Sequence, residues 1–266
     1  MLSEIGYGGW GIGGSQWKGG SDEESLRALH RAFELGVNFV DTALAYGDGH
    51  SERLIGRAVQ DWGQPLVVAT KIPPMNRIWP APVEAPLDAV FPRNYIIEST
   101  EQSLRNLRLE TLDLQQFHVW NPLWTAQEEW QRTVESLKQS GKVRFMGVSL
   151  TEHDADSGLD LVDSGVIDAL QVVYNIFDPR ANERLLPFAE SRGVGILARV
   201  PLDEGGLSGA IRSDTTFQGE EFRAQYFGGD RKQQVIEHAT AITNDTGGDP
   251  RRLPEIACVS VSVPPP

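Results

Sequence analysis

The sequence has 266 residues, of which 40% are hydrophobic and 23% charged, and its formal net charge is −13. This length fits one barrel-sized domain, and the composition is that of a globular protein. The acidic balance argues against nucleic-acid and anionic membrane-surface partners, because phosphate groups are bound by Lys and Arg. No apolar run reaches the length of a membrane-spanning helix, so we expect no membrane partner.

Cys258 is the single cysteine of the sequence, and one cysteine cannot form an intrachain disulfide. This cysteine usage is typical of a reducing compartment. The first residues lack the charged and apolar regions of a signal peptide. We therefore expect a cytoplasmic protein.

Short β-rich segments alternate with helical patterns along the chain. Ser21 and Glu24 match a capping box at the start of the first helix, and Gly36 matches its stop. Strand-helix repeats with nearly continuous apolar strands indicate a parallel sheet, and seven of them in about 200 residues favour a barrel. The predicted strands are residues 3–9, 37–43, 66–72, 112–118, 143–149, 169–175 and 194–200, and the predicted helices are 21–36, 49–63, 93–108, 125–141 and 151–165.

The fold class predicted from this order is α/β, a (β/α)8 TIM barrel forming one domain over residues 1–266. Two long connections, 72–92 and 201–230, follow predicted strands, so in a barrel both lie on the catalytic face. Loops of this length are typical of lids and binding loops.

Polar side chains stand at or near the ends of six consecutive predicted strands. Each alone fits an ordinary rim residue, but together they indicate an active site at the carboxyl ends of the strands. A formal G-x-G-x-x-G pattern at Gly6, Gly8 and Gly11 is rejected as a dinucleotide fingerprint, because the next helix begins near Ser21. The spacing of His30, His50, His153 and His238 matches no metal site. The six residues are Asp41, Lys71, His118, Ser149, Asn175 and Arg199.

Several segments together resemble the aldo-keto reductase family. VNFVDTALAYGDGHSERLIGRAV is similar to the signature around the family's catalytic Asp and Tyr, and VVATK to the strand that bears its lysine. LRNLRLETLDLQQFH resembles the segment before its histidine, and GKVRFMGVS and LQVVYN resemble the next two strand regions. The resemblance covers about residues 3–257.

The resemblance implies a catalytic tetrad of Asp41, Tyr46, Lys71 and His118, and reduction of aldehydes or ketones with NADPH, NADH being possible. The chemistry is sensible, because a carbonyl that accepts hydride needs a proton donor at its oxygen. Tyrosine has an ordinary pKa of about 10, and a nearby lysine cation is expected to lower it. The alternative is a structural Asp41–Lys71 ion pair with Tyr46 packed in a loop.

The resemblance also implies a cofactor site. Arg199 stands where the family commonly stacks a tyrosine on the nicotinamide, and Leu150 where it usually has asparagine. A guanidinium plane can also stack on an aromatic ring. The implied nicotinamide contacts are Ser149, Gln171 and Asn175, and the implied stacking and phosphate-loop contacts are Arg199, Pro201, Leu202, Gly205, Gly206 and Leu207. Trp10, Trp79 and Trp120 are expected to line the substrate pocket, with simple packing as the alternative.

The carboxyl end departs from the family. After RRLPEIA the family continues as a helix, an eighth strand and a phosphate-binding loop, whereas residues 258–266 read CVSVSVPPP. Reverse translation allows codons in which one added cytidine after the Ala257 codon restores Ala-Leu-Arg-Phe-Cys-Leu. We therefore predict a frameshift and an incomplete last βα unit, with weakened cofactor binding. The alternative is a naturally divergent tail, in which the alternating VSVSV supplies the missing strand.

Three functions follow as alternatives. The first is an NAD(P)H-dependent oxidoreductase that acts on a small-molecule carbonyl. The second is a non-catalytic barrel of the same family that senses a cofactor or binds a partner, its cofactor site impaired by the altered end. The third uses the same residues for redox-neutral dehydration or isomerisation. An open sheet edge would also allow a homo-oligomer.

Overall fold

The computed structural model describes residues 2–14, 20–150, 154–217 and 222–262. Within them, seven strands form one sheet in the order in which they occur in the chain, and each neighbouring pair is parallel. Every predicted strand is present, so the predicted parallel architecture is confirmed. The strands are β1 Tyr7–Gly8, β2 Phe39–Asp41, β3 Val67–Ile72, β4 Leu112–Phe117, β5 Val143–Ser149, β6 Ala169–Val173 and β7 Gly195–Arg199.

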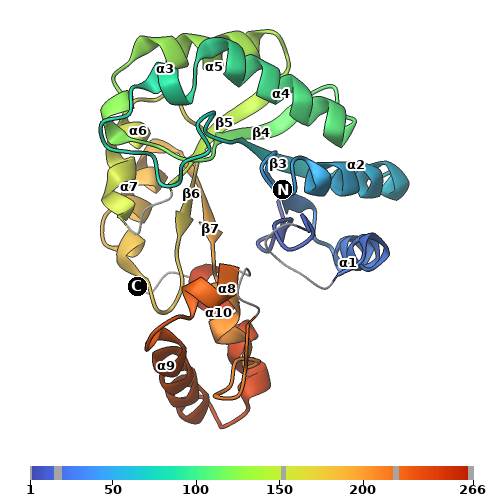
Figure 1. The fold of residues 1–266 in the computed structure, drawn as a ribbon, viewed down its shortest axis with the longest axis vertical. Coiled ribbons are helices and arrows are strands. Elements are labelled where there is room, and N and C mark those ends of the chain that lie inside the picture. The colour runs from blue at the N-terminus through green and yellow to red at the C-terminus, as the bar shows by residue number, and fades with distance from the viewer. Residues whose placement is uncertain (1, 15–19, 151–153, 218–221, 263–266) are drawn as a thin grey trace.

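The sheet curls into an open barrel with the helices on its outer side (Figure 1). In the described residues β1 pairs only with β2 and β7 only with β6, so the eighth βα unit is incomplete. The helices are α1 Asp22–Glu34, α2 His50–Trp62, α3 Leu87–Val90, α4 Arg93–Leu107, α5 Glu128–Gln139, α6 Leu159–Asp163, α7 Leu185–Arg192, α8 Phe222–Tyr226, α9 Arg231–Asp245 and α10 Leu253–Ser262, with short 3-10 turns η1 Pro122–Trp124, η2 Ala155–Gly158, η3 Arg180–Asn182, η4 Asp203–Ser208 and η5 Pro250–Arg252.

Local signals determine where α1 begins and ends. The Ser21 side chain accepts a hydrogen bond from the Glu24 N–H, and the Glu24 carboxylate accepts one from the Ser21 N–H, which is the predicted capping box. The helix ends at Glu34, and Gly36 follows with a φ of 93°. This left-handed conformation favours glycine, so the predicted stop is confirmed.

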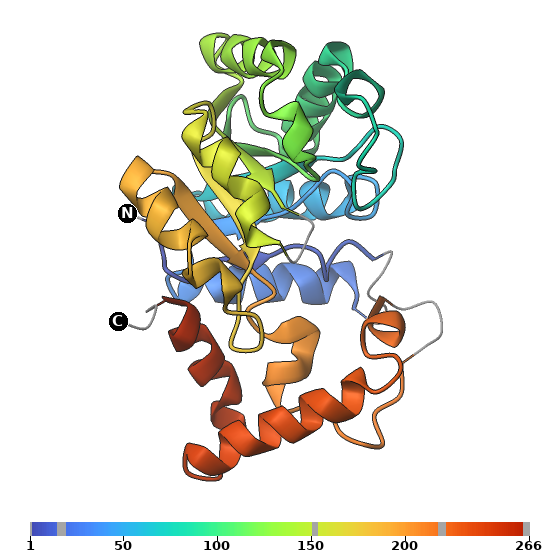
Figure 2. The ribbon, with the colours of Figure 1, turned by 90° about the vertical axis from the view of Figure 1, so that its left-hand side faces the viewer.

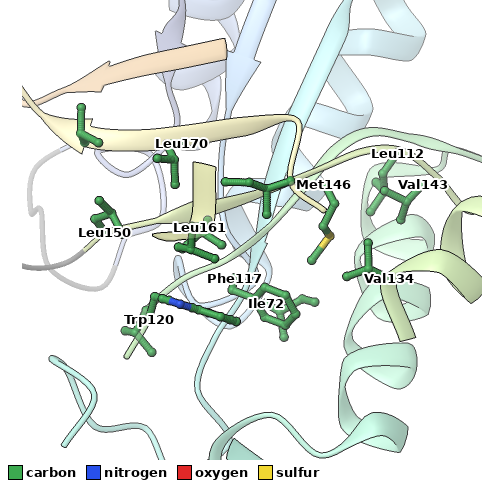
Figure 3. Close-up of a cluster of buried hydrophobic side chains, with 14 of the residues drawn as sticks. Ile72, Leu112, Phe117, Trp120, Val134, Val143, Met146, Leu150, Leu161 and Leu170 are labelled. Atoms are coloured by element: carbon green, nitrogen blue, oxygen red, sulfur yellow. The ribbon is translucent and has the colours of Figure 1, made fainter. Parts of the chain in front are cut away.

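The main hydrophobic core lies between the outer face of the sheet and the helices (Figure 3). Trp120, Trp124 and Trp130 are at most 5% exposed, and the Trp120 ring meets the other two edge-on. Phe117 of β4 contacts Trp120 and Trp130. The cluster inside the barrel is much smaller. Its buried members are Phe39, Ala69, Leu114 and Ala169. Most apolar burial therefore comes from the outer layer.

The long connection 72–92 is held against the loop after β4. The Asn121 amide donates to the carbonyl oxygens of Pro82 and Val83, and the Trp124 indole N–H donates to that of Ala85. Buried polar groups with partners of this kind fix a loop in place. This loop brings Trp79 to the carboxyl ends of the strands.

After β7 the chain forms a separate helical layer, in which α9 and α10 pack on η4 (Figures 1 and 2). The alternative in which VSVSV forms a strand is wrong, because its described residues, 259–262, belong to α10. Leu253 and Ala257, four residues apart on one helix face, are at most 2% exposed. Their burial outweighs the strand preference of the alternating valines. Residues 263–266 of the predicted tail lie outside the described residues, as do 151–153, where the fifth predicted helix was to begin.

The described ranges contain no helix that combines the length and the apolar character needed to cross a membrane.

Truncation of Trp130 tests the assignment of the outer core. Trp130 is fully buried and donates its indole N–H to the Trp124 carbonyl oxygen at 3.0 Å. Trp130→Ala should lower the free energy of unfolding by about 3–5 kcal/mol, through lost burial and a cavity. Urea denaturation measures this, with Phe145→Ala as the control, since Phe145 of β5 is 48% exposed. Equal losses for the two variants would contradict the assignment.

Candidate active site

Lys71 is the centre of a buried charge cluster at the carboxyl end of β3. Its side chain is fully buried, and its ammonium donates to Asp41 Oδ2 at 2.6 Å and to the Thr42 carbonyl oxygen at 2.8 Å. A third donor points at the Tyr46 hydroxyl, 3.5 Å away. A buried ammonium is tolerated only when it is paired in this way. The expected Asp41–Lys71 ion pair is confirmed.

Asp41 is oriented by a residue that the sequence analysis did not single out. Its Oδ1 accepts a hydrogen bond from the Gln116 side-chain amide at 3.2 Å. Gln116 of β4 lies opposite Lys71 of β3 in the sheet register. A signal was available, because Gln116 precedes His118 by two residues and alternate residues of a strand share one face.

Tyr46 is placed by a close backbone approach between two loops. A Cβ at Gly47, whose φ is 64°, would lie 2.0 Å from the Gly13 carbonyl oxygen. A Cβ at Gly13 would lie 3.1 Å from the Tyr46 Cβ. Two glycines thus let the loop after β1 press against the loop after β2. The Tyr46 ring then lies 5.2 Å from the Lys71 ammonium, measured to the ring centroid.

The net pKa of Tyr46 is raised, which differs from the sequence-based expectation. Burial of the phenol is the largest cause and raises the pKa, while the Lys71 cation lowers it and the Asp41 carboxylate raises it. Lys71 therefore acts in the expected direction, but desolvation outweighs it. Tyr46 is a protonated phenol at neutral pH.

His118 packs against Tyr46. Its ring meets the Tyr46 ring edge-on, with centroids 5.6 Å apart. Burial, then the Lys71 and Arg199 cations, hold the pKa of His118 well below its ordinary 6.5. The imidazole is therefore neutral, and its buried Nδ1 has no hydrogen-bond partner among the described residues. A neutral ring can still donate a hydrogen bond from one nitrogen.

Aromatic side chains surround this cluster. The Trp10 ring lies 6.2 Å from that of Tyr46, and the Trp79 ring lies 5.8 Å from that of His118. Trp120 is not brought to this rim. It is 5% exposed within the outer core, and its indole N–H donates to Thr125 Oγ1.

The implied nicotinamide contacts fall into two groups. Ser149 and Gln171 are paired residues of β5 and β6, at most 5% exposed, and the Ser149 hydroxyl donates to the Gln171 side-chain oxygen at 3.3 Å. Asn175 has a structural task instead. Its side-chain oxygen accepts from the N–H groups of Phe177 and Asp178, and its amide donates to the Val200 carbonyl oxygen.

Arg199 stands at the end of β7. Its Nη2 donates to the Leu150 carbonyl oxygen at 2.9 Å, and its buried Nε has no hydrogen-bond partner among the described residues. Burial lowers the pKa of Arg199, but a guanidinium remains a cation at neutral pH. An unpaired buried donor of this kind is a group that a ligand can satisfy.

The loop after β7 has an unusual backbone. Val200, Asp203 and Glu204 have φ values of 60°, 49° and 53°, which is a strained conformation, above all for a β-branched residue. The buried Asp203 carboxylate holds the loop, because it accepts hydrogen bonds from Tyr226 and Arg231, each at 2.7 Å.

The glycines of the same loop are needed for packing. A Cβ at Gly206 would lie 2.6 Å from Asp203 Oδ2 and 2.7 Å from Val235 Cγ1, and Gly205 has a φ of 105°. Leu207 and Gly205 direct their N–H groups back to the Leu202 carbonyl oxygen. Pro201 and Leu202 form the start of this loop, next to Arg199.

Glu204 is a second residue that the sequence analysis missed. Burial raises its pKa to about 7, an effect that Arg199 opposes and Asp203 reinforces. It is titratable near neutral pH for this reason. Its sequence signal is weak, since nothing in PLDEGG distinguishes it from an ordinary loop acid.

Several of these groups line a cavity of about 950 Å³. Asp41, Tyr46, Gln171, Arg199 and Glu204 line its polar part, and Trp10 lines it beside Tyr46. The rest of the cavity follows the gap between β1 and β7. A pocket with a few convergent polar groups and perturbed pKa values is a default candidate for an active site.

The fold and the site together define a class of protein. It is an incomplete (β/α)8 barrel with a cluster of Tyr, Lys, Asp and His at the carboxyl ends of its strands. The model of the aldo/keto reductase family matches residues 4–253. The chain belongs to the aldo/keto reductase family.

Individual relatives agree with this assignment. The chain is 30% identical to the aldo-keto reductase YhdN of Bacillus subtilis over 83% of its own length and 65% of that protein. It is 28% identical to the NADH-specific methylglyoxal reductase of Escherichia coli over 89% of its length and 74% of that protein. The chain thus spans about two thirds to three quarters of these relatives.

Solved structures show the same fold. The glycerol dehydrogenase of Gluconobacter oxydans matches 98% of this chain and 79% of its own, with a TM-score of 0.76 and 30% identity. An aldo-keto reductase from Klebsiella pneumoniae in complex with NADPH matches 95% of this chain and 75% of its own, with a TM-score of 0.62 and 24% identity.

A double-mutant cycle tests the buried ion pair. Asp41→Asn should cost about 3–5 kcal/mol of unfolding free energy, because it leaves the buried Lys71 ammonium without its anion. The double variant Asp41→Asn/Lys71→Met removes both charges and should lose less than the sum of the two single variants. Urea denaturation of the four proteins measures the coupling, and additive losses would show that the pair contributes no interaction energy.

The raised pKa of Glu204 predicts a pH-dependent stability. The folded protein binds a proton at Glu204 up to about pH 7, whereas an unfolded glutamate loses it near its ordinary value. The stabilisation of the folded state by protonated Glu204 is therefore complete below the pKa of glutamate in the unfolded chain. It is lost as the pH rises through the pKa of Glu204 in the folded protein. The wild type should lose thermal stability as the pH rises from 5 to 8, whereas Glu204→Gln has no such proton to lose. The thermal stability of Glu204→Gln relative to the wild type should therefore increase over this range. The exposed Glu183→Gln is the control, and parallel pH profiles for wild type and Glu204→Gln would contradict the expectation.

Proposed function

We propose that this chain is an oxidoreductase that reduces the carbonyl group of a small aldehyde or ketone to an alcohol with NADPH, NADH being possible. The observation that carries this proposal is the 3.5 Å contact between the Lys71 ammonium and the Tyr46 hydroxyl, with Lys71 anchored on Asp41. The family membership and the named activities of the relatives support it.

In the proposed reaction a bound nicotinamide would supply the hydride for the new C–H bond at the carbonyl carbon. The electrons of the C=O π bond move to the oxygen, which takes the proton of the Tyr46 hydroxyl. The raised pKa of Tyr46 keeps that proton in place until the oxygen becomes strongly basic. The Lys71 cation then stabilises the phenolate that remains.

His118 acts as a neutral hydrogen-bond donor to the carbonyl oxygen. Its depressed pKa keeps it uncharged at neutral pH. It orients the carbonyl toward Tyr46 without competing as the acid. Trp10 and Trp79 form the apolar sides of the proposed substrate pocket, while Trp120 stays in the core.

The described residues fit the nicotinamide end of the cofactor. Ser149 and Gln171 are buried side chains that can donate hydrogen bonds to, and accept them from, the carboxamide of a nicotinamide. Arg199 offers its unpaired Nε and the planar face of its guanidinium. The Asn175 side chain has a structural role, because its hydrogen bonds hold the turn before Pro179 and the backbone at Val200. The loop of Pro201, Leu202, Gly205, Gly206 and Leu207 is the proposed phosphate side.

A cofactor-sensing or partner-binding barrel is the second candidate. The observation that favours it is the incomplete eighth βα unit, which leaves the β1 and β7 edges open beside the proposed phosphate loop. Weak NADPH binding without turnover would support this candidate.

Replacing the proposed acid tests the reductase. Tyr46→Phe should lower NADPH-dependent reduction of a carbonyl panel, methylglyoxal included, by about 100-fold or more, because general acid catalysis is lost. NADPH binding, measured by fluorescence titration, should remain close to that of the wild type. Tyr95→Phe in α4 is the matched control.

Undiminished turnover in Tyr46→Phe would remove Tyr46 from the role of the acid. Absence of NADPH and NADH binding to folded wild-type protein would reject the reductase.

A further inference from the structure

The Arg199 side chain reaches across the carboxyl ends of three neighbouring strands. Arg199 ends β7, and its Nη2 donates to the carbonyl oxygen of Leu150, the residue that follows β5. β6 lies between these two strands in the sheet, and the Leu150 N–H donates to the carbonyl oxygen of Gln171 in β6. Gln171 lines the same cavity as Arg199, and its side chain accepts from the Ser149 hydroxyl. The guanidinium therefore lies beside the proposed nicotinamide contacts.

The charge of Arg199 is held in this place without a close anion. Its Nη2 contacts a neutral carbonyl oxygen, and its buried Nε has no hydrogen-bond partner among the described residues. Burial lowers the pKa of Arg199, and the carboxylates of Glu204 and Asp41, which raise it through space, do not outweigh that effect. The guanidinium is still a cation at neutral pH. Its positive charge is thus fixed in direction and not cancelled by an ion pair.

The other charged groups of the cavity leave this charge largely uncompensated. Asp41 lines the cavity but is paired with Lys71 at 2.6 Å. Glu204 also lines the cavity, and burial raises its pKa to about 7, so it is ionised in about half of the molecules at neutral pH. Glu4, a further lining residue, is exposed to solvent. The polar part of the cavity therefore has a net positive charge at neutral pH.

The two redox forms of a nicotinamide differ in charge at the ring. The oxidised ring is a pyridinium cation, whereas the reduced ring is a neutral dihydropyridine. The adenosine, ribose and phosphate groups are the same in both forms of the cofactor, so their contributions to binding cancel when the two forms are compared. Like charges that lie close together in a poorly solvated site repel each other strongly. A cation fixed beside the ring therefore distinguishes the two forms.

We propose that Arg199 makes the site select the reduced nicotinamide cofactor over the oxidised one, because its cation repels the charged ring and not the neutral ring. This inference rests on the proposed function, since it requires a nicotinamide beside Arg199. Glu204 weakens the selection when it is ionised, because its carboxylate offsets part of the Arg199 charge. The selection favours uptake of reduced cofactor and release of oxidised cofactor, and hence carbonyl reduction over alcohol oxidation.

The experiment measures dissociation constants of the full chain by isothermal titration calorimetry, for NADPH and NADP⁺ and for NADH and NAD⁺. The readout is the ratio of the oxidised to the reduced constant within a pair. Arg199→Gln removes the cation and keeps a planar polar group, so it should lower this ratio by about tenfold or more. Arg199→Lys keeps a cation and should hold the ratio within about threefold of the wild type.

Two further variants separate charge from structure. Arg192→Gln changes the net charge equally, but Arg192 is an exposed residue of α7 that pairs with Asp163, so the ratio should stay unchanged. Glu204→Gln is measured at pH 8, where Glu204 of the wild type is mostly ionised. It should raise the ratio, because it removes the charge that offsets Arg199. A purely structural role would change both constants of a pair together and leave the ratio as it is.

The outcomes distinguish the inference from the proposed function. A wild-type protein that is folded by circular dichroism but binds none of the four dinucleotides would reject both. Binding with the same ratio in the wild type and Arg199→Gln would overturn the inference and leave the proposed function standing. An equal fall of the ratio in Arg199→Gln and Arg199→Lys would also overturn it, because the guanidinium plane would then be the cause. A lower ratio in Glu204→Gln would contradict the electrostatic origin.

Discussion

The buried Lys71–Asp41 pair is the interaction on which the site depends. An ammonium without solvent has to be surrounded by acceptors, and Asp41, the Thr42 carbonyl and the Tyr46 hydroxyl are the three acceptors that β2 and its loop provide. Gln116 holds the second Asp41 oxygen. Because these groups come from β2, β3 and β4, the pairing register of three strands is fixed at the same time as the positions of the groups in the candidate site.

The loop after β7 also contains a buried charge that must be paired. Asp203 is buried, and the hydroxyl of Tyr226 and the guanidinium of Arg231 converge on its Oδ1. These bonds tie the strained residues after Val200 to α8 and α9. The helical layer that follows the sheet therefore contributes to the site by holding a backbone that would relax if the layer were lost.

Much of this arrangement was predictable from the sequence. Alternating strand and helix patterns gave all seven strands, because buried parallel strands are continuous apolar runs that differ clearly from amphipathic helices. The Asp41–Lys71 pair was also predictable, since both residues lie at the carboxyl ends of neighbouring strands. The net direction of the Tyr46 pKa was missed, because desolvation depends on how other loops cover the phenol. Trp120 was misplaced because the turn after β4 directs it outward into the core, which local sequence does not reveal. The helical state of residues 259–262 was also not predictable, as it depends on packing between α10 and η4.

The imbalance between the two cores has a consequence for electrostatics. The outer core contains almost all of the large buried side chains, whereas the buried cluster inside the barrel has four members, one of them Phe39 at the wall of the gap. Water that enters through the gap can approach the Asp41 side chain, which is 18% exposed while that of Lys71 is 1% exposed. The two partners of one ion pair thus experience different local dielectric environments. Closing the gap would strengthen the attraction between them and, through Lys71, the stabilisation of a charged Tyr46 oxygen, so the wall of the barrel sets the strength of the electric field in the proposed active site.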